Sequence, residues 1–524
     1  MLRSLQCIVA YVVFLGLLLF MHHTRIAKDD GLIGEELAVG YRNVVYFEQQ
    51  RITDGYSTNY SGQIFYYIGS KVLPITINSA RILTILATAF LGPLILLFMY
   101  RLCPRASLLS AWFPVLLLPM LPAVAWYGSI ATENLTDCAF SFAALYSAFD
   151  WHWCWRRTSF WVRLFSFIAL FAFAVHFYPS SLPVLMCTLM IVLWRTWSQK
   201  ESIKGALFQL GIFALIVAAL TVWPYFYYNE SHIPLWQGGG QLLLTKEALW
   251  SNLRINYLDL FVQPASYLIG GYVEQPCFAF FRGGIFIVFL LVLGLFSFNR
   301  QQESFSILFI TIASLALTTV AGANPGIRRA MPFVICFCLF AGMGIHFIAT
   351  RRSIILVRTL SALIVPVILY SCRAYYPDLS LRFITIISAL SAAAILCVSI
   401  FLAHQDRSRL IAPVFGIVFL VAPFLNFLDA SESVSKHYTA WLQRQFKYMP
   451  GKNYEETIGA LLQSMQKESI EISTDDYAFE TLVLLDLFCR RRQISCIPPR
   501  IVGNGPVDNR VKLFSQLDPW KGDS

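Results

Sequence analysis

Charged residues are scarce in this chain. Only 13% of its 524 residues are charged, whereas 57% are hydrophobic and the mean hydropathy is +0.61. A soluble globular protein carries about 25% charged residues, so this composition excludes that class. The net charge of +10 does not indicate nucleic-acid binding, because no soluble domain shows a basic face.

Several local signals are also missing. No cysteine and histidine spacing resembles a zinc site, and there is neither a solenoid repeat nor a low-complexity segment. The first apolar run is followed by His22, His23, Thr24 and Arg25 rather than by a small-residue cleavage site. We therefore expect this run to remain as a membrane anchor.

Long apolar runs recur along the chain, and membrane spans need roughly 17 to 25 such residues. They predict an all-α polytopic membrane protein with about thirteen transmembrane helices. The expected spans are 5–21, 81–100, 106–122, 134–149, 159–178, 181–194, 206–228, 281–298, 305–322, 330–348, 353–370, 383–403 and 410–428.

Arginine and lysine in the short loops predict the orientation, because such residues gather on the cytoplasmic side. If the spans alternate, one side carries Arg101, Arg105, Arg156, Arg157, Arg195, Lys200, Lys204, Arg300, Arg351, Arg352, Arg407 and Arg409. That side is expected to be cytoplasmic. The first loop (22–80), a further loop (229–280) and the C-terminal tail then lie outside.

The chain is therefore expected to divide into a transmembrane module, 1–428, and an external soluble domain, 429–524. In the first loop, 62–73 (GQIFYYIGSKVL) is typical of an external juxtamembrane helix lying in the interface. The tail alternates helix patterns with short strand patterns at 470–473 and 494–497, which predicts a small α/β appendage.

Four acids stand close together in the first loop: Asp29, Asp30, Glu35 and Glu36. They could be solvated loop charges or could begin a helix. The alternative is a general base at the bilayer edge, where a lipid-borne substrate meets an acceptor from water.

A second acidic pair precedes the span at 134–149. Glu133 and Asp137 are four residues apart in SIATENLTD, and in a helix this spacing puts both carboxylates on one face. Glu133 is the candidate catalytic acid and Asp137 a candidate for the substrate cavity. A helix-capping function of Asn134 or Thr136 is the structural alternative.

Cationic and polar candidates lie at other external span ends. Arg328 and Arg329 precede the span at 330–348, and two external arginines run against the usual charge distribution. Either the topology is misplaced there, or they bind a lipid phosphate, which suits the guanidinium fork. His176 and Tyr178, in HFYPSS, could face the same cavity or could be packing residues.

The order of these features resembles the GT-C superfamily of polytopic glycosyltransferases. An acidic first loop is followed by GQIFYYIGSKVLP, then by SARILTILATAFLGPLILLFMY, by a second-loop acid and by an arginine-rich entry to a later span. Protein O-mannosyltransferases and the bacterial aminoarabinose transferases acting on lipid A are the most similar members. The likeness covers roughly residues 1–350.

The resemblance implies transfer of a sugar from a polyprenyl-phosphate donor to an acceptor on the external face, with inversion. The family's first-loop acidic pair corresponds to Glu35 and Glu36 or to Asp29 and Asp30, and its second-loop acid to Glu133 or Asp137. YPSSLP stands where the family often has a lysine, so donor-phosphate binding would rest on Arg328 and Arg329.

The implied partners are a polyprenyl-phosphate sugar, membrane lipids and a glycan, lipid or protein acceptor. Mg²⁺ or Mn²⁺ held by the first-loop acids is compatible with the sequence but not required. A bacterial inner membrane is favoured, with the endoplasmic reticulum as alternative. Two other functions stay open: a secondary transporter, disfavoured because no inverted repeat is visible, and a polysaccharide polymerase or ligase.

Overall fold

The computed structural model describes most of the first half of the chain and fewer residues after it. The long described stretches are 2–23, 60–73, 77–130, 134–151, 158–175, 181–198, 245–253, 302–320 and 330–350. The short ones are 211, 214–215, 268–269, 273–274, 290–291, 293–295, 297, 420, 424, 462–469, 471–473, 495, 497 and 500–502.

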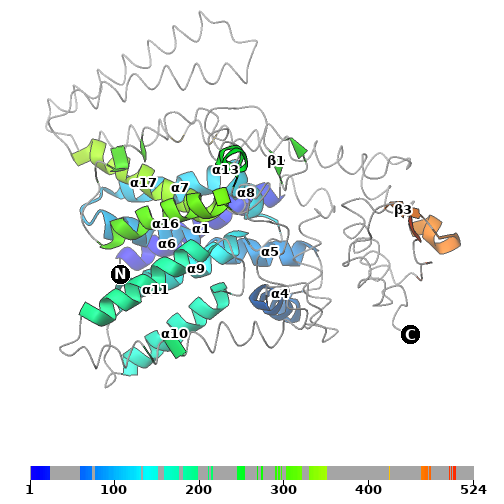
Figure 1. The fold of residues 1–524 in the computed structure, drawn as a ribbon, viewed down its shortest axis with the longest axis horizontal. Coiled ribbons are helices and arrows are strands. Elements are labelled where there is room, and N and C mark those ends of the chain that lie inside the picture. The colour runs from blue at the N-terminus through cyan, green and yellow to red at the C-terminus, as the bar shows by residue number, and fades with distance from the viewer. Residues whose placement is uncertain are drawn as a thin grey trace, which may run out of the picture.

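Apolar helices form the bundle, as the composition predicts (Figure 1). They are α1 (Leu2–Met21), α5 (Ile77–Thr88), α6 (Leu91–Leu102), α7 (Leu108–Met120), α8 (Pro122–Tyr127), α9 (Asn134–Phe149), α10 (Thr158–Val175), α11 (Leu182–Ser198), α16 (Gln302–Val320) and α17 (Met331–Thr350). Within the described part of the chain, three stretches are long and apolar enough to cross a membrane: Arg3–Phe20, Ser79–Leu102 and Met331–Ile348. The count of thirteen spans stays a prediction, because the spans expected at 206–228, 281–298 and 353–428 fall mostly outside the described residues.

The span expected at 81–100 corresponds to the apolar stretch Ser79–Leu102, which contains two successive helices, α5 and α6. A tight turn at Ala89 and Phe90 separates α5 from α6, with the Gly92 amide donating to the Ala89 carbonyl (3.1 Å). Pro93 explains the break, because it has no amide hydrogen to continue the helical ladder. The span expected at 106–122 likewise ends early, at Met120, and the short α8 follows.

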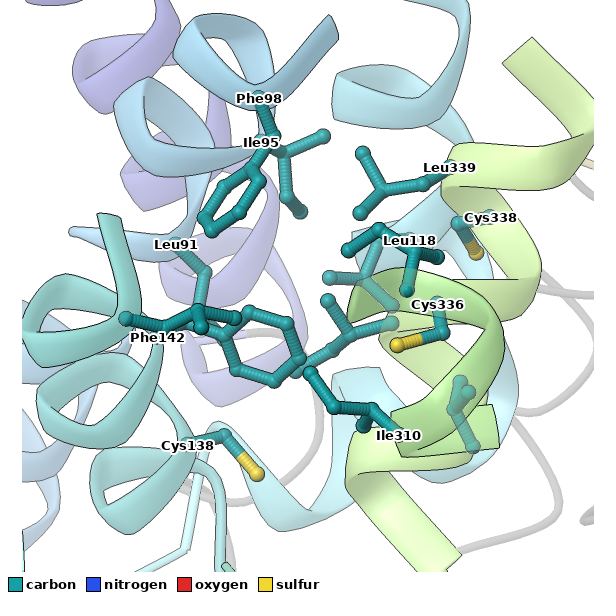
Figure 2. Close-up of a cluster of buried hydrophobic side chains, with 14 of the residues drawn as sticks. Leu91, Ile95, Phe98, Leu118, Cys138, Phe142, Ile310, Cys336, Cys338 and Leu339 are labelled. Atoms are coloured by element: carbon teal, nitrogen blue, oxygen red, sulfur yellow. The ribbon is translucent and has the colours of Figure 1, made fainter. Parts of the chain in front are cut away.

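The core of the bundle is built around α17, which is buried along almost its whole length. A helix that is apolar on every side belongs at the centre of its neighbours rather than at their edge. Figure 2 shows Cys336 and Leu339 of α17 facing Leu118 of α7, Ile310 of α16 and Phe142 of α9.

Helix α4 (Tyr60–Val72) confirms the helix expected at 62–73 and lies beside α5 (Figure 1). Tyr66 is buried, and its hydroxyl shares a 2.8 Å hydrogen bond with the Thr84 hydroxyl of α5. Gly69 permits this packing, because a Cβ there would collide with the side chain of Leu83. On the other face Ile64 and Ile68 are exposed, as expected for an interfacial helix.

Short strands occur in the two other predicted external segments. β1 (Leu268–Ile269) pairs antiparallel with β2 (Val273–Glu274), and β3 (Glu471–Ser473) pairs parallel with β4 (Arg500–Val502). β3 confirms the strand expected at 470–473. The strand expected at 494–497 is wrong, because the Ile497 amide donates to the carbonyl of Met465 (2.7 Å) and the strand begins at Arg500.

Candidate functional site

The two ends of the bundle differ in how they hold charge. At one end, here called the Arg101 end, Arg101 of α6 forms ion pairs with Asp150, directly after α9, and with Glu303 of α16 (3.5 Å). Its guanidinium also lies 4.6 Å from the ring centre of Tyr146. These contacts bring the end of α6, the end of α9 and the start of α16 together, as the predicted alternation of spans requires.

Exposed tryptophans mark the same end. Trp161 lies in the first turn of α10, and Trp194 and Trp197 lie in the last turn of α11. Tryptophan gathers at membrane–water interfaces because its ring is apolar and its N–H is polar. The Arg101 end therefore has the composition of a bundle face at the membrane surface.

The opposite end, here called the Asp137 end, buries its polar groups. It includes the start of α5, the turn before α9, the start of α9 and the residue before α11. The buried polar residues there are Arg81, Thr84, Thr88, Ser129, Thr136, Asp137, Ser141 and Ser181.

Asp137 lies in the first turn of α9 and is fully buried. A carboxylate is favoured at a helix N-terminus by the helix macrodipole. The desolvation cost of a buried charge exceeds that gain, which is about 1 kcal/mol. One turn further, the Ser141 hydroxyl donates to that of Ser181 (3.0 Å) and so joins α9 to the start of α11.

Arg81 is a second buried charge that the sequence analysis did not select. It is 1% exposed and shares the inner face of α5 with Thr84 and Thr88. A cation so close to a helix N-terminus is opposed by the macrodipole, so this site favours anionic surroundings. The sequence signal for this buried face was helical spacing: Thr84 and Thr88 follow Arg81 by three and seven residues in an otherwise apolar helix.

The end of α1 adjoins the turn before α9. The Ser129 hydroxyl donates to the Leu18 carbonyl (3.2 Å) and to the Ala125 carbonyl (2.6 Å). The first loop leaves α1 here, and the second loop begins after Ile130. The structure therefore brings together the places where these two predicted acidic loops start.

In the sequence, the predicted acids stand close to this point. Asp30 follows His23 by seven residues, and Glu133 follows Ile130 by three. Figure 2 shows Cys138 of α9 in one cluster with Cys336 of α17, and Arg329 stands two residues before α17 in the sequence. The described ends of α1, α8 and α17 are therefore the segments that adjoin the predicted site residues along the chain.

Of the predicted site residues, Asp137 is described and buried at this end. The others lie outside the described residues: Asp29, Asp30, Glu35, Glu36, Glu133, His176, Tyr178, Arg328 and Arg329. The helical pairing of Glu133 with Asp137 stays a prediction, because the described part of α9 begins at Asn134. Within the described residues no group of three His, Cys, Asp or Glu could hold a metal ion.

Comparison with known proteins identifies the fold. No protein-family model and no curated protein sequence matches the chain. Two crystal structures of ArnT from Cupriavidus metallidurans do match, each over 98% of this chain and 88% of theirs. The apo structure has a TM-score of 0.58 at 12% identity, and the structure bound to undecaprenyl phosphate 0.51 at 13%.

Identity this low shows the fold, and the match extends over nearly the whole chain. It agrees with the GT-C type of fold that the resemblance implies and with the apolar helices described above. This chain is a multi-pass integral membrane protein with the fold of ArnT.

Proposed function

We propose that this protein is a membrane glycosyltransferase that moves a sugar from a polyprenyl-phosphate donor to an acceptor hydroxyl at the Asp137 end. The observation that carries the proposal is the fold match over 98% of the chain to ArnT, which has also been crystallised with undecaprenyl phosphate. A lipid phosphate is a substrate that a protein embedded in the bilayer can meet directly.

The distribution of buried charge supports the choice of this end. Arg81 and Asp137 are fully buried here, on the contacting helices α5 and α9. Buried charges are costly and are kept where they bind, orient or transfer something. At the Arg101 end the charges form ion pairs with one another close to water.

The reaction requires one bond to form and one to break. A first-loop carboxylate from Asp29, Asp30, Glu35 or Glu36 takes the proton of the acceptor hydroxyl. The acceptor oxygen attacks the anomeric carbon, and the bond from that carbon to the phosphate oxygen breaks with its electron pair. One displacement inverts the anomeric centre and releases the polyprenyl phosphate.

The other predicted residues would position the partners and offset charge. Glu133, as the second-loop acid, would orient the acceptor, and holding the two partners in line supplies a large part of such catalysis. Arg328 and Arg329 would stabilise the negative charge that builds up on the leaving phosphate. Mg²⁺ or Mn²⁺ shared by the first-loop acids would serve the same purpose.

The proposed location is a bacterial inner membrane, with the Asp137 end facing away from the cytoplasm. The tryptophans of the opposite end suit either membrane surface, and Arg101 there is the kind of residue that gathers on the cytoplasmic side. The sugar is a hexose or a pentose, and the acceptor is a glycan, a lipid or a protein.

Turnover of a labelled donor tests the proposal. Purified protein would receive radiolabelled polyprenyl-phosphate sugars together with candidate acceptors, and release of free polyprenyl phosphate would be measured. Asp30→Asn and Glu35→Gln should each be compared with the wild type, and loss of activity in only one of them identifies the base. Asp150→Asn is the matched control, because this carboxylate lies at the Arg101 end.

The absence of turnover with every donor and acceptor pair would contradict the proposal. Full activity in both first-loop variants would instead remove these two acids from the mechanism. Uptake of labelled solute into proteoliposomes, driven by a proton gradient, would favour the transporter alternative.

A further inference from the structure

A long apolar groove opens on the side of the bundle and begins beside the Asp137 end, where Leu83 and Phe140 line it next to Thr84 and Ser141. Its volume is about 760 Å³, and residues from α1, α4, α5, α6, α9 and α10 line it. Tyr11 carries the single hydroxyl among the lining residues, and this hydroxyl donates to the Leu86 carbonyl (3.2 Å). Hence the groove offers a ligand apolar contacts only.

The groove runs along the bundle and faces outward. Leu83 lines it in the middle of α5 and Leu97 lines it in α6, on either side of the turn at Ala89 and Phe90. Its rim includes Ile8, which is 61% exposed, and Phe90, which is 56% exposed. An opening at this depth in a membrane-spanning bundle faces the hydrocarbon of the bilayer.

Water is a poor occupant of such a groove. A bound water needs two to four polar partners, and the lining provides none. At roughly 30 Å³ for each heavy atom, the groove holds about 25 carbon atoms. This matches one long acyl chain of a bilayer lipid and is less than half of a 55-carbon polyprenyl chain.

We propose that the groove binds one acyl chain of a bilayer phospholipid and that this chain forms part of the surface on which α4 rests. Phe65 of α4 lines the groove, and its ring packs edge-on against Phe140 of α9, with ring centres 6.3 Å apart. The adjacent Tyr66 anchors α4 to Thr84. An acyl chain in the groove therefore contacts the helix that connects the first loop to α5.

The predicted consequence is that bound phospholipid stabilises α4. The chain would contribute apolar contact along Phe65, and its removal would leave this side of α4 facing a void. The proposed effect of phospholipid on α4 does not involve sugar transfer. It can therefore be tested by measuring lipid binding and protein stability, without a turnover assay.

Variants that fill the groove provide the test. Ala143→Phe and the milder Ala87→Leu both add bulk to the lining. Val162→Phe is the matched control, because Val162 is 61% exposed on α10 and does not line the groove. Each full-length protein would be purified in mild detergent, and bound phosphatidylglycerol or phosphatidylethanolamine would be counted by native mass spectrometry.

We expect wild type and Val162→Phe to retain one phospholipid and the groove variants to retain roughly tenfold less. Adding phosphatidylglycerol to delipidated protein should slow hydrogen exchange of residues 60–72 in wild type and leave it unchanged in Ala87→Leu. Equal phospholipid retention in all variants would overturn the proposal. It would also be overturned if polyprenyl phosphate, and not phospholipid, slowed exchange in α4, since the groove would then hold the donor chain.

Discussion

The Arg101 end and the Asp137 end contain the same kinds of charged residue in opposite environments. The carboxylate of Asp150 is 60% exposed, and it pairs with an arginine side chain that is itself 21% exposed. Asp137 and Arg81 are almost completely removed from solvent. The difference indicates that the ion pairs at the Arg101 end hold helix ends together. The Asp137 end, in contrast, retains charged side chains despite the free-energy cost of burying them.

The largest expected difference between the ends is catalytic. Asp137→Asn keeps the shape of the side chain and removes its charge, so it should lower turnover of a polyprenyl-phosphate sugar by on the order of 100-fold, as losing one stabilising group in an active site does. Asp150→Asn should remain within about twofold of wild type, because its carboxylate is largely hydrated. Equal losses in both variants would remove the functional distinction between the ends.

Replacement of Arg81 and replacement of Arg101 should lower the free energy of unfolding by different amounts. Arg81→Gln removes a buried charge and leaves its surroundings uncompensated, which should cost about 3–5 kcal/mol. Arg101→Gln should cost less, roughly 1 kcal/mol, because one of its two partners, Asp150, is 60% exposed. Melting temperatures in one detergent would rank the two, and a larger loss in Arg101→Gln would contradict the comparison.

The ion pair between Arg101 and Glu303 should show a small coupling that depends on salt. A double-mutant cycle with Arg101→Met and Glu303→Gln is expected to give about 0.5–1 kcal/mol at low ionic strength. The side chains of Arg101 and Glu303 are only 21% and 16% exposed, so 1 M salt should weaken the coupling only in part, although the Debye length falls to about 3 Å. Complete loss of the coupling at 1 M salt would mean that the pair is open to water.

The smallest expected difference in stability between the two ends concerns one tyrosine hydroxyl at each end. Tyr66→Phe removes the buried bond to Thr84, whose hydroxyl still donates to the Ala80 carbonyl (3.1 Å), so about 1 kcal/mol should be lost. Tyr100→Phe removes the 2.8 Å bond to Gln6 at the Arg101 end and should cost less, since water can replace it. Chemical denaturation of both variants would measure this difference, and a reversed order would count against it.

Much of the helical architecture could be predicted from local patterns. The apolar runs predicted α1, α9 and α17 within a few residues, and the aromatic segment predicted α4. Two details were not predicted. Pro93 interrupts a continuous apolar run and divides it into α5 and α6, and β4 begins at Arg500, three residues after the end of the strand that hydrophobicity predicted.

The site was less predictable, because burial of a charge is decided by neighbouring helices. Asp137 was selected because it is four residues after Glu133 at a span end, and the structure buries it. Arg81 was not selected, since a single arginine at the start of an apolar run is also what an ordinary membrane boundary provides. The first-loop acids remain a prediction from sequence.

By itself, the sequence determined that this protein crosses the membrane many times, since an apolar chain of this composition has no other stable environment. It also determined which segments are helical, because each span must satisfy its own backbone. Only the tertiary structure decided which charges are hidden. Arg81 and Arg101 lie at opposite ends of one apolar stretch, and the first is buried on α5, which packs against α4 and α9, whereas the second pairs with Glu303 and with the exposed Asp150.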